Sequence, residues 1–199
     1  MSAVVRLGAV SYLNVRPLVF GLESASRFTL RYDVPSECAR LLQAGGIDVG
    51  MIPSIEYLHG DTYRIVPDLA IVSCGEVASV ALFTRRPIVD VRSIALDTSS
   101  RTSVALVRVL CARLFKIQPA IQALDPDLDV MLERADAALV IGDNALLWTG
   151  QSAVGSRQSA AEKIDLGAAW TGMTGLPFVW AFWAGREDAL TPDDVRALV

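Results

Sequence analysis

The chain has 199 residues, of which 52% are hydrophobic and 20% are charged, and its formal net charge is −4 at pH 7. This length exceeds the ~100–150 residues of a typical domain, so we expect one large domain or two small lobes. The composition excludes disordered and collagen-like proteins. A net negative charge without a cluster of Lys and Arg indicates that nucleic acid is not the partner.

Membrane insertion and secretion are not expected either. The longest apolar runs, such as residues 177–184, are far shorter than the roughly 20 residues that span a bilayer. Residues 1–10 contain an Arg and no apolar core of signal-peptide length, so we expect a cytoplasmic protein.

Cysteine and histidine usage predicts neither a metal site nor a cofactor. Cys38, Cys74 and Cys111 are far apart in the sequence, and His59 is the single histidine. These spacings do not build the usual zinc site, and we expect each cysteine to be a small buried hydrophobe. The sequence carries no dinucleotide or P-loop motif.

The first part of the chain alternates short apolar strands with helical patterns. Strands are predicted at residues 4–10, 28–32 and 47–52, and helices at residues 17–22, at 35–44 before Gly45-Gly46, and from Pro53-Ser54. This βαβαβα order predicts a parallel sheet in a doubly wound lobe.

The pattern changes from residue 69, where two β-rich segments at 69–74 and 77–84 leave no room for a helix. Further on, the sequence predicts strands at 94–96, 137–141, 163–166 and 178–183, an amphipathic helix at 102–116 and a short helix at 145–148. We therefore predict an α/β fold with lobe 1 at residues 1–85, lobe 2 at 86–176 and a return to lobe 1 at 177–199. Each lobe is expected to hold a mostly parallel sheet that is buried on both faces.

Three polar loops follow predicted strands, where open α/β sheets place their ligands. They are Ser11-Tyr12-Leu13-Asn14, the hydroxyl-rich residues 97–103, and Gly142-Asp143-Asn144. The second loop precedes the strongest predicted helix, and its hydroxyls, its Arg101 and the helix N-terminus suit a carboxylate. The alternative is that its Ser and Thr residues only cap the helix.

Two single residues also have two readings. Asp143 is either a general acid or the N-cap of the short helix that follows it. The amide of Asn14 can donate and accept, so Asn14 either orients a ligand or is a turn residue before a proline-containing helix.

Residues 11–18, SYLNVRPL, resemble the SYLNxxPL signature of the chorismate dehydratase family, which opens the futalosine route to menaquinone. Other segments that resemble this family follow in order over nearly the whole chain, at residues 35–37, 48–58, 79–80, 94–97, 99–103, 135–138, 141–143 and 175–179.

The resemblance implies a two-lobed periplasmic-binding-protein type II fold that holds its substrate between the lobes. It also implies that C-terminal helices, about a third of the usual family length, are missing after Val199. The implied reaction eliminates water from the dicarboxylate chorismate, giving 3-[(1-carboxyvinyl)oxy]benzoate, without a cofactor. Because no side-chain base is evident, the substrate's own enolpyruvyl carboxylate is the hypothetical base.

The resemblance also implies residue roles. Asn14 orients the reacting carboxylate or the leaving hydroxyl, and Ser79 hydrogen-bonds the ligand. Pro53 and Ser54 shape the wall of lobe 1, and Arg101 either pairs with a carboxylate or points outward. The remaining residues expected to bind the substrate are Ser11, Tyr12, Ser99, Ser100, Thr102, Ser103 and Asp143.

Two other functions stay open. A non-catalytic binding protein for a small carboxylate would leave its ligand unchanged. A sister enzyme that acts on a cyclised futalosine derivative carries a CPNDT-like motif, which this sequence lacks. The sequence leaves the oligomeric state undetermined.

Overall fold

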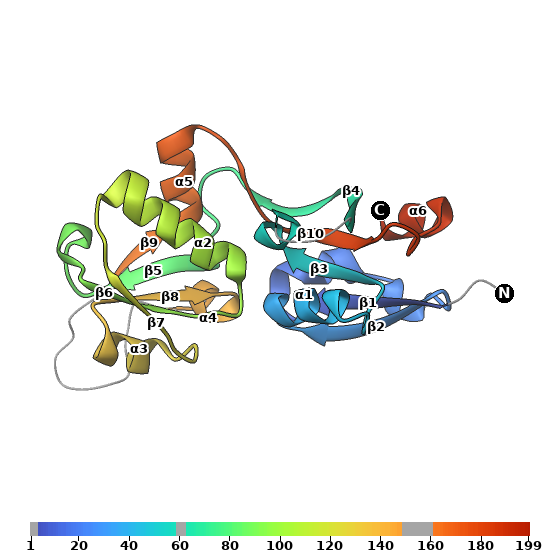
Figure 1. Ribbon diagram of the computed structural model, residues 1–199, viewed down its shortest axis with the longest axis horizontal. Coiled ribbons are helices and arrows are strands. Elements are labelled where there is room, and N and C mark those ends of the chain that lie inside the picture. Colours follow the sequence, from blue (N-terminus) through green and yellow to red (C-terminus); the bar gives the residue numbers. More distant parts are fainter. Residues whose placement is uncertain (1–3, 59–62, 149–160) are drawn as a thin grey trace. The chain divides into compact units, whose positions relative to one another are not determined.

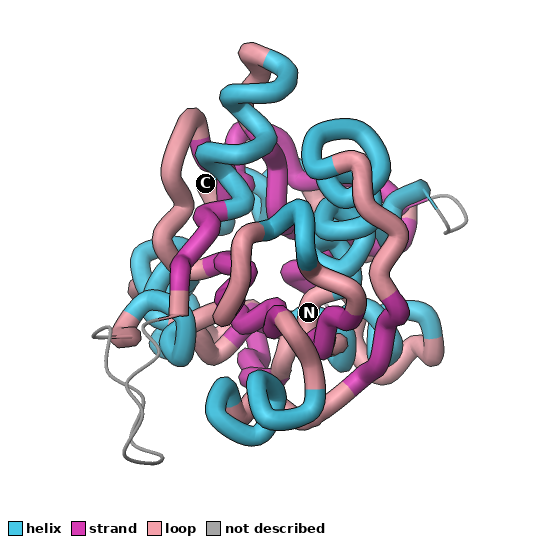
Figure 2. The backbone as a smooth tube through the Cα atoms, turned by 90° about the vertical axis from the view of Figure 1, so that its left-hand side faces the viewer, coloured by secondary structure: helices cyan, strands magenta, loops and turns pink. Residues whose placement is uncertain are grey.

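The computed structural model describes residues 4–58, 63–148 and 161–199, so His59 lies outside the described residues. The chain forms two compact units. The first unit contains Met1–Val72, Ser99–Thr102 and Val179–Val199, and the second contains Ser73–Thr98 and Ser103–Phe178. Each unit is built on one five-stranded sheet (Figure 1), and loops connect the strands to helices along the chain (Figure 2).

The sheet of the first unit has the strand order β2-β1-β3-β10-β4. Its strands are β1 (Val5–Val10), β2 (Phe28–Asp33), β3 (Val49–Pro53), β4 (Tyr63–Ser73) and β10 (Phe178–Arg186). β1 runs parallel to β2 and β3, whereas β10 runs antiparallel to β3 with Ala181 opposite Pro53. The three strands predicted in this part of the sequence are confirmed.

The helices of the first unit are η1 (Leu13–Val19), η2 (Leu22–Ser24), α1 (Pro35–Gln43), η3 (Ser54–Leu58) and α6 (Pro192–Leu198). α1 starts at a proline, as predicted, and packs against β1 and β3 (Figure 1). The helix predicted at residues 17–22 is wrong. Pro17 lies inside the 3-10 helix η1, and Gly21, at φ 81°, has a left-handed conformation that interrupts the helical path.

The sheet of the second unit has the order β7-β6-β8-β5-β9. Its strands are β5 (Val80–Thr84), β6 (Ser93–Leu96), β7 (Ala120–Ala123), β8 (Ala137–Ile141) and β9 (Glu162–Asp165). β6 runs parallel to β7 and β8, and β5 runs antiparallel to β8 and β9. The predicted α/β fold with two sheets is confirmed, and the strand pairing shows that both sheets are mixed.

The antiparallel strands have a topological cause. β5 and β10 are each the first strand after the chain changes unit. Each starts at the edge where the parallel strands of its sheet end, because Val80 lies opposite Ile141 and Ala181 lies opposite Pro53. A strand that enters at this carboxyl edge has to run against its parallel neighbours.

The pairing of β5 also corrects the predicted lobe boundary. We predicted that residues up to 85 belong to lobe 1, but β5 forms ladders with β8 and β9. Residues 73–85 therefore lie in the second unit, and the division falls after Val72. Arg85-Arg86-Pro87, which interrupts the β-rich pattern of the sequence, follows the end of β5 and lies within the second unit.

The helices of the second unit are η4 (Ile88–Asp90), α2 (Arg101–Leu110), η5 (Cys111–Phe115), α3 (Leu128–Arg134), α4 (Asp143–Leu146) and α5 (Leu166–Thr174). α2 continues into the π-helical turn η5 and ends at Lys116, so the amphipathic helix predicted at 102–116 is confirmed. Every residue of β3, β5 and β8 is buried. Such continuous apolar strands are typical of sheets that are covered on both faces.

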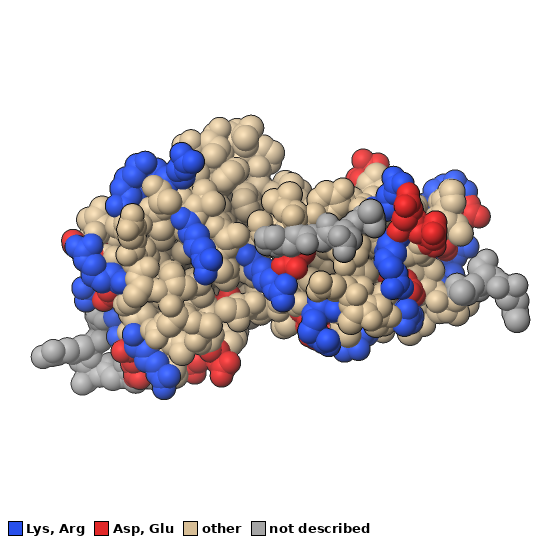
Figure 3. Space-filling view, viewed as in Figure 1, with Lys and Arg blue, Asp and Glu red and all other residues tan. Residues whose placement is uncertain are grey.

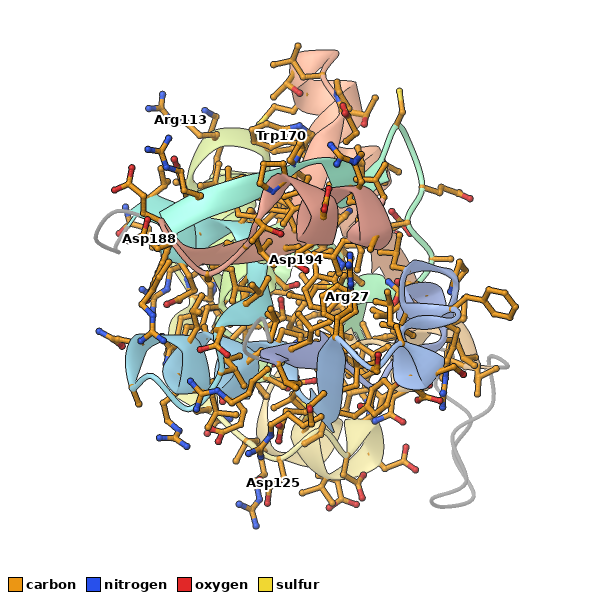
Figure 4. The ribbon with its side chains drawn as sticks, turned by 90° about the vertical axis from the view of Figure 1, so that its right-hand side faces the viewer. Arg27, Arg113, Asp125, Trp170, Asp188 and Asp194 are labelled. Carbon is orange, nitrogen blue, oxygen red and sulfur yellow. The ribbon has the colours of Figure 1, made fainter. Side chains whose placement is uncertain are left out.

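The N-terminus of α6 is capped by side chains and is linked to the residue before β2. Thr191 and Asp194 form a capping box, as their spacing predicts. Arg27, which precedes β2, lies beside Asp194 (Figure 4), with Arg27 Nη1 3.7 Å from Asp194 Oδ1. Arg27 Nη1 also donates to the carbonyl oxygen of Asp193 at 2.9 Å. Two parts of the chain that are distant in sequence are joined at this point.

Two of the three cysteines are buried, as predicted. Burial raises the pKa of the Cys38 thiol to about 12 and that of Cys111 to about 11. The prediction for Cys74 is wrong, because this residue follows β4 in an exposed loop. Among the described residues, no helix combines the length and apolar character that crossing a membrane requires.

Candidate functional site

The carboxyl edge of the first sheet brings several predicted site residues together. Ser11 and Tyr12 follow β1, and Ser54 begins η3 directly after Pro53, the last residue of β3. β1 and β3 are parallel neighbours, so both segments leave the sheet at the same edge. This is the edge at which open α/β sheets bind ligands.

The segment Ser99–Thr102 docks on this edge of the first unit. The backbone N–H of Ser36, in the first turn of α1, donates to the carbonyl oxygen of Ser99 at 2.9 Å. The hydroxyls of Tyr12 and Ser99 are 3.4 Å apart. The loop predicted to hold a carboxylate thus lies beside the loop that carries Tyr12. Tyr12 is half-buried and Ser100 is buried.

Hydroxyl groups form a directed chain of hydrogen bonds within this region. The N–H of Ile55 donates to Thr102 Oγ1 at 3.2 Å, and Ser54 Oγ donates to the carbonyl oxygen of Val179 at 2.7 Å. Ser54 Oγ and Thr102 Oγ1 are 3.3 Å apart. Because Ser54 has only one hydroxyl proton and gives it to Val179, Thr102 is the donor to Ser54.

These hydrogen bonds give Thr102 a structural role. Its hydroxyl proton is committed to Ser54, and the Ser54 proton is committed to the backbone. Neither hydroxyl has a proton left to donate to a carboxylate in this arrangement. Thr102 therefore anchors the segment to the first unit, and the expected role of Ser54 in the wall of the substrate site stays a prediction.

Arg101 has a protein partner. Its Nη1 lies 2.9 Å from Oε2 of Glu56 in η3. The Arg101 side chain is 50% exposed, whereas that of Glu56 is 13% exposed. Oε1 of Glu56 is buried and accepts no hydrogen bond from the described part of the chain. In the sequence, Glu56 stands out only as a part of the family-like segment 48–58. Its pairing with Arg101 could not be predicted, because the two residues are 45 positions apart.

Asn14 and Ser11 lie on the surface of the first unit. Asn14 is exposed in η1, and its side chain forms no hydrogen bond with the residues that the structure describes. The backbone N–H of Ser11 donates to the carbonyl oxygen of Asp33 at 3.3 Å. Among the described residues, the Asn14 amide has no hydrogen-bond partner. Its donor and acceptor are therefore available to a ligand, as a role in orienting a ligand requires.

The second unit brings Ser79 and Asp143 together at the carboxyl edge of its own sheet. The N–H of Gly142 donates to the carbonyl oxygen of Ser79 at 2.7 Å. Asp143 is the first residue of α4, and Gly142 is the N-cap. The alternative in which Asp143 caps this helix is therefore wrong, because the helix starts two residues earlier than predicted. Ser79 is buried and Asp143 is partly buried.

Ser103 lies in the first turn of α2 and is almost completely buried, as is Asp97 at the end of β6. The N–H of Asp97 donates to the carbonyl oxygen of Leu139 at 3.1 Å. β6 and β8 are parallel neighbours, so Asp97 and Gly142-Asp143 leave the sheet at the same edge. Buried polar residues gather at this edge of the second unit.

Asp165, which sequence reasoning missed, organises the loop before Ser79. Its carboxylate accepts hydrogen bonds from the N–H groups of Val77 at 3.1 Å and Ala78 at 2.7 Å. It also caps α5 by accepting from the N–H of Ala168 at 2.9 Å. The sequence carried only a weak signal, an Asp just before a helical pattern.

Other polar features lie away from these edges. A cavity of about 600 Å³ opens at the opposite edge of the first sheet, beside Asp48, Arg186 and Asp194. Within the described ranges, no group of three or more His, Cys, Asp and Glu side chains is arranged to hold a metal ion. On the face that Figure 3 shows, basic and acidic side chains are interspersed with wide uncharged areas.

Comparison with known proteins decides the family. Residues 5–199 match the family described as Menaquinone biosynthesis. The chain belongs to this family. A curated member, chorismate dehydratase of Thermus thermophilus, is 33% identical over 203 residues, which cover 97% of this chain and 73% of that protein.

Solved structures show the fold of this menaquinone-biosynthesis family member. A crystal structure of a protein from Archaeoglobus fulgidus matches with a TM-score of 0.69 at 15% identity, covering 98% of this chain and 74% of that chain. The periplasmic aliphatic sulphonate binding protein SsuA from Escherichia coli matches with a TM-score of 0.59 at 15% identity, covering 94% and 62%. The predicted periplasmic-binding-protein-like fold is confirmed.

Proposed function

We propose that this chain is a chorismate dehydratase, a hydro-lyase that converts chorismate into 3-[(1-carboxyvinyl)oxy]benzoate and water. The observation that carries the proposal is the 33% identity with the Thermus thermophilus chorismate dehydratase over 97% of the chain. Membership of the menaquinone-biosynthesis family supports it. As a biosynthetic enzyme that acts on a small dicarboxylate, it would work in the cytoplasm.

The reaction asks the protein mainly for orientation. The proton leaves C3 of the ring, hydroxide leaves C4, and the electrons of the C3–H bond form the C3–C4 double bond that completes the aromatic ring. No oxidant or reductant is needed for this balance. Aromatisation favours the products, so positioning and electrostatic preorganisation can supply the remaining rate enhancement.

The residues at the two carboxyl edges suit this task. The exposed amide of Asn14 would orient the enolpyruvyl carboxylate, which acts as the base at C3, or the departing hydroxyl. Ser99 and Ser100, with backbone N–H groups at the start of α2, would hold a carboxylate in the first unit, beside Ser11 and Tyr12. Ser79, Ser103 and Asp143 would contact the substrate from the second unit.

The direct test is incubation of the purified chain with chorismate, followed by absorbance and by chromatography of the aromatic product. We expect chorismate to disappear and 3-[(1-carboxyvinyl)oxy]benzoate to form in equal amount. Heat-denatured protein controls for spontaneous decay of chorismate. Binding of chorismate without product would instead support a non-catalytic carboxylate-binding protein and refute the enzyme.

A further inference from the structure

We propose that Lys163 is a positioning residue that fixes Ser79 and Asp143, two residues expected to bind the substrate, in one arrangement. This inference rests on the proposed function. Lys163 Nζ donates to the carbonyl oxygen of Ala78 at 2.9 Å and to that of Ala145 at 2.9 Å. Ala78 directly precedes Ser79, and Ala145 lies two residues after Asp143, so one ammonium group joins the two loops.

The bonds of Lys163 add to a direct contact between the same loops. The N–H of Gly142 already donates to the carbonyl oxygen of Ser79 at 2.7 Å. This bond continues the ladder between β5 and β8, in which Val80 lies opposite Ile141. The ammonium holds each loop at a further point beyond the ladder, at Ala78 in one loop and at Ala145 in the other.

Lys163 and Asp165 hold Ala78 from both sides. They are two residues apart on β9, so their side chains point to the same face of the strand. Asp165 accepts a hydrogen bond from the N–H of Ala78 at 2.7 Å, and Lys163 donates one to the carbonyl oxygen of Ala78. Ala78 has φ 59°, a conformation that is uncommon for a residue other than glycine. The two charged groups therefore stabilise a backbone conformation that sets the direction of Ser79.

The residue type fits a bridge between carbonyl groups. The chain has 18 basic residues besides its histidine, and only Lys116 and Lys163 are lysines. An ammonium is a compact group with three donors, whereas the planar guanidinium of Arg suits carboxylates. Lys163 has no carboxylate partner within the described residues. Its Nζ also lies 5.9 Å from the centre of the Phe83 ring.

The test compares Lys163→Met, which keeps the length of the side chain and removes its donors, with Lys163→Arg and a matched control. The control is Arg85→Met, because Arg85 Nη1 also donates to a backbone carbonyl, that of Leu132 at 3.1 Å, and follows the far end of β5. We expect Lys163→Met to lower kcat/KM for chorismate on the order of 10–100-fold, mainly through KM. Lys163→Arg should recover part of this loss, and Arg85→Met should stay within about twofold of the unchanged chain.

Hydrogen exchange provides a readout that does not need the reaction. The Gly142 amide should exchange faster in Lys163→Met than in the unchanged chain or in Arg85→Met. If the unchanged chain does not consume chorismate, the proposed function fails, and exchange at Gly142 alone decides whether Lys163 fixes the loops. If Lys163→Met does not fold, Lys163→Gln takes its place. Equal losses of kcat/KM in the Lys163 and Arg85 variants, or unchanged exchange at Gly142, would overturn the proposal.

Discussion

The two units order the carboxyl edges of their sheets in different ways. In the first unit, neutral groups hold one another through the hydrogen bonds that link Thr102, Ser54 and Val179, and one ion pair, between Arg101 and Glu56, joins the same segment to η3. In the second unit, the charged side chains of Lys163 and Asp165 hold the backbone of Ala78. Hydrogen bonds to charged groups are roughly twice as strong as neutral ones. We infer that the Thr102 and Ser54 hydroxyls contribute less to the stability of their unit than the Asp165 carboxylate contributes to its own.

The largest effect is expected from Asn14 in the first unit. Asn14→Ala should lower kcat for chorismate by on the order of 10²–10³, the loss seen when one oriented donor is removed from an active site. The free energy of unfolding should change by less than about 0.5 kcal/mol, because the Asn14 side chain is exposed and makes no hydrogen bond with the described residues. Steady-state kinetics and chemical denaturation measure the two quantities.

The control for Asn14 is Gln43→Ala, another exposed amide in the same unit, at the end of α1. It should leave kcat and stability unchanged. Near-normal turnover in Asn14→Ala would remove this residue from the mechanism, and the first unit would then contribute only binding groups.

The charged arrangement of the second unit is tested by Asp165→Ala. The variant loses the acceptor for the N–H groups of Val77, Ala78 and Ala168, so we expect a loss of about 2 kcal/mol in the free energy of unfolding. Asp127→Ala is the matched variant, because Asp127 caps α3 through Val130 alone. It should lose only about 1 kcal/mol. Equal losses would mean that the bonds to the loop contribute nothing to stability.

The local features of both units could be predicted from the sequence. Apolar runs identified the strands, and the amphipathic pattern identified α2, because both signals arise from neighbours in the chain. The rule that ligands bind at carboxyl edges also singled out the loops that carry Tyr12, Ser99 and Asp143. The rule does not predict with which residue each side chain forms its hydrogen bond or ion pair.

The contacts that define the two edges join residues far apart in sequence. Ser54 and Thr102 are separated by 48 positions, Glu56 and Arg101 by 45, and Ala78 and Lys163 by 85. Such pairs depend on strand order and register, which one sequence without relatives does not contain. The same reason explains the boundary error, because the hydrophobicity of β5 does not say which sheet it joins.

The neutral arrangement of the first unit is tested by Thr102→Val, which keeps the shape of the side chain and removes the hydroxyl. We expect a loss of about 1–2 kcal/mol in the free energy of unfolding, because Ile55 loses its acceptor and Ser54 loses a donor. Thr29→Val, at an exposed position of β2, should have little effect. The KM for chorismate should change by less than about threefold, and Thr102→Ser should restore stability. A large rise in KM without loss of stability would assign Thr102 to the substrate and contradict its anchoring role.

The smallest effect is expected from an exposed ion pair at the amino edge of the first sheet. Asp48 accepts hydrogen bonds from Arg6 Nε at 2.9 Å and Nη2 at 2.6 Å, and its Oδ1 also lies 3.2 Å from Arg186 Nη2. The side-chain hydrogen bonds from Arg6 are the main cause that lowers the pKa of Asp48 in the folded chain. A carboxylate with a lowered pKa stabilises the fold above its unfolded pKa of about 3.9, and this contribution is lost as the pH falls through the folded pKa.

Arg6→Met should therefore lower the denaturation midpoint near pH 7 by a small amount, because the Arg6 side chain is about half exposed and solvent screens the pair. The difference from the unchanged chain should shrink as the pH is lowered through the lowered pKa of Asp48 in the folded chain, because Asp48 then becomes protonated in both. Arg108→Met removes a charge from an exposed position of α2 and should show no such pH dependence. If the Arg6 variant is instead as stable as the unchanged chain at both pH values, the pair of Arg6 and Asp48 contributes nothing measurable to the stability of the first unit.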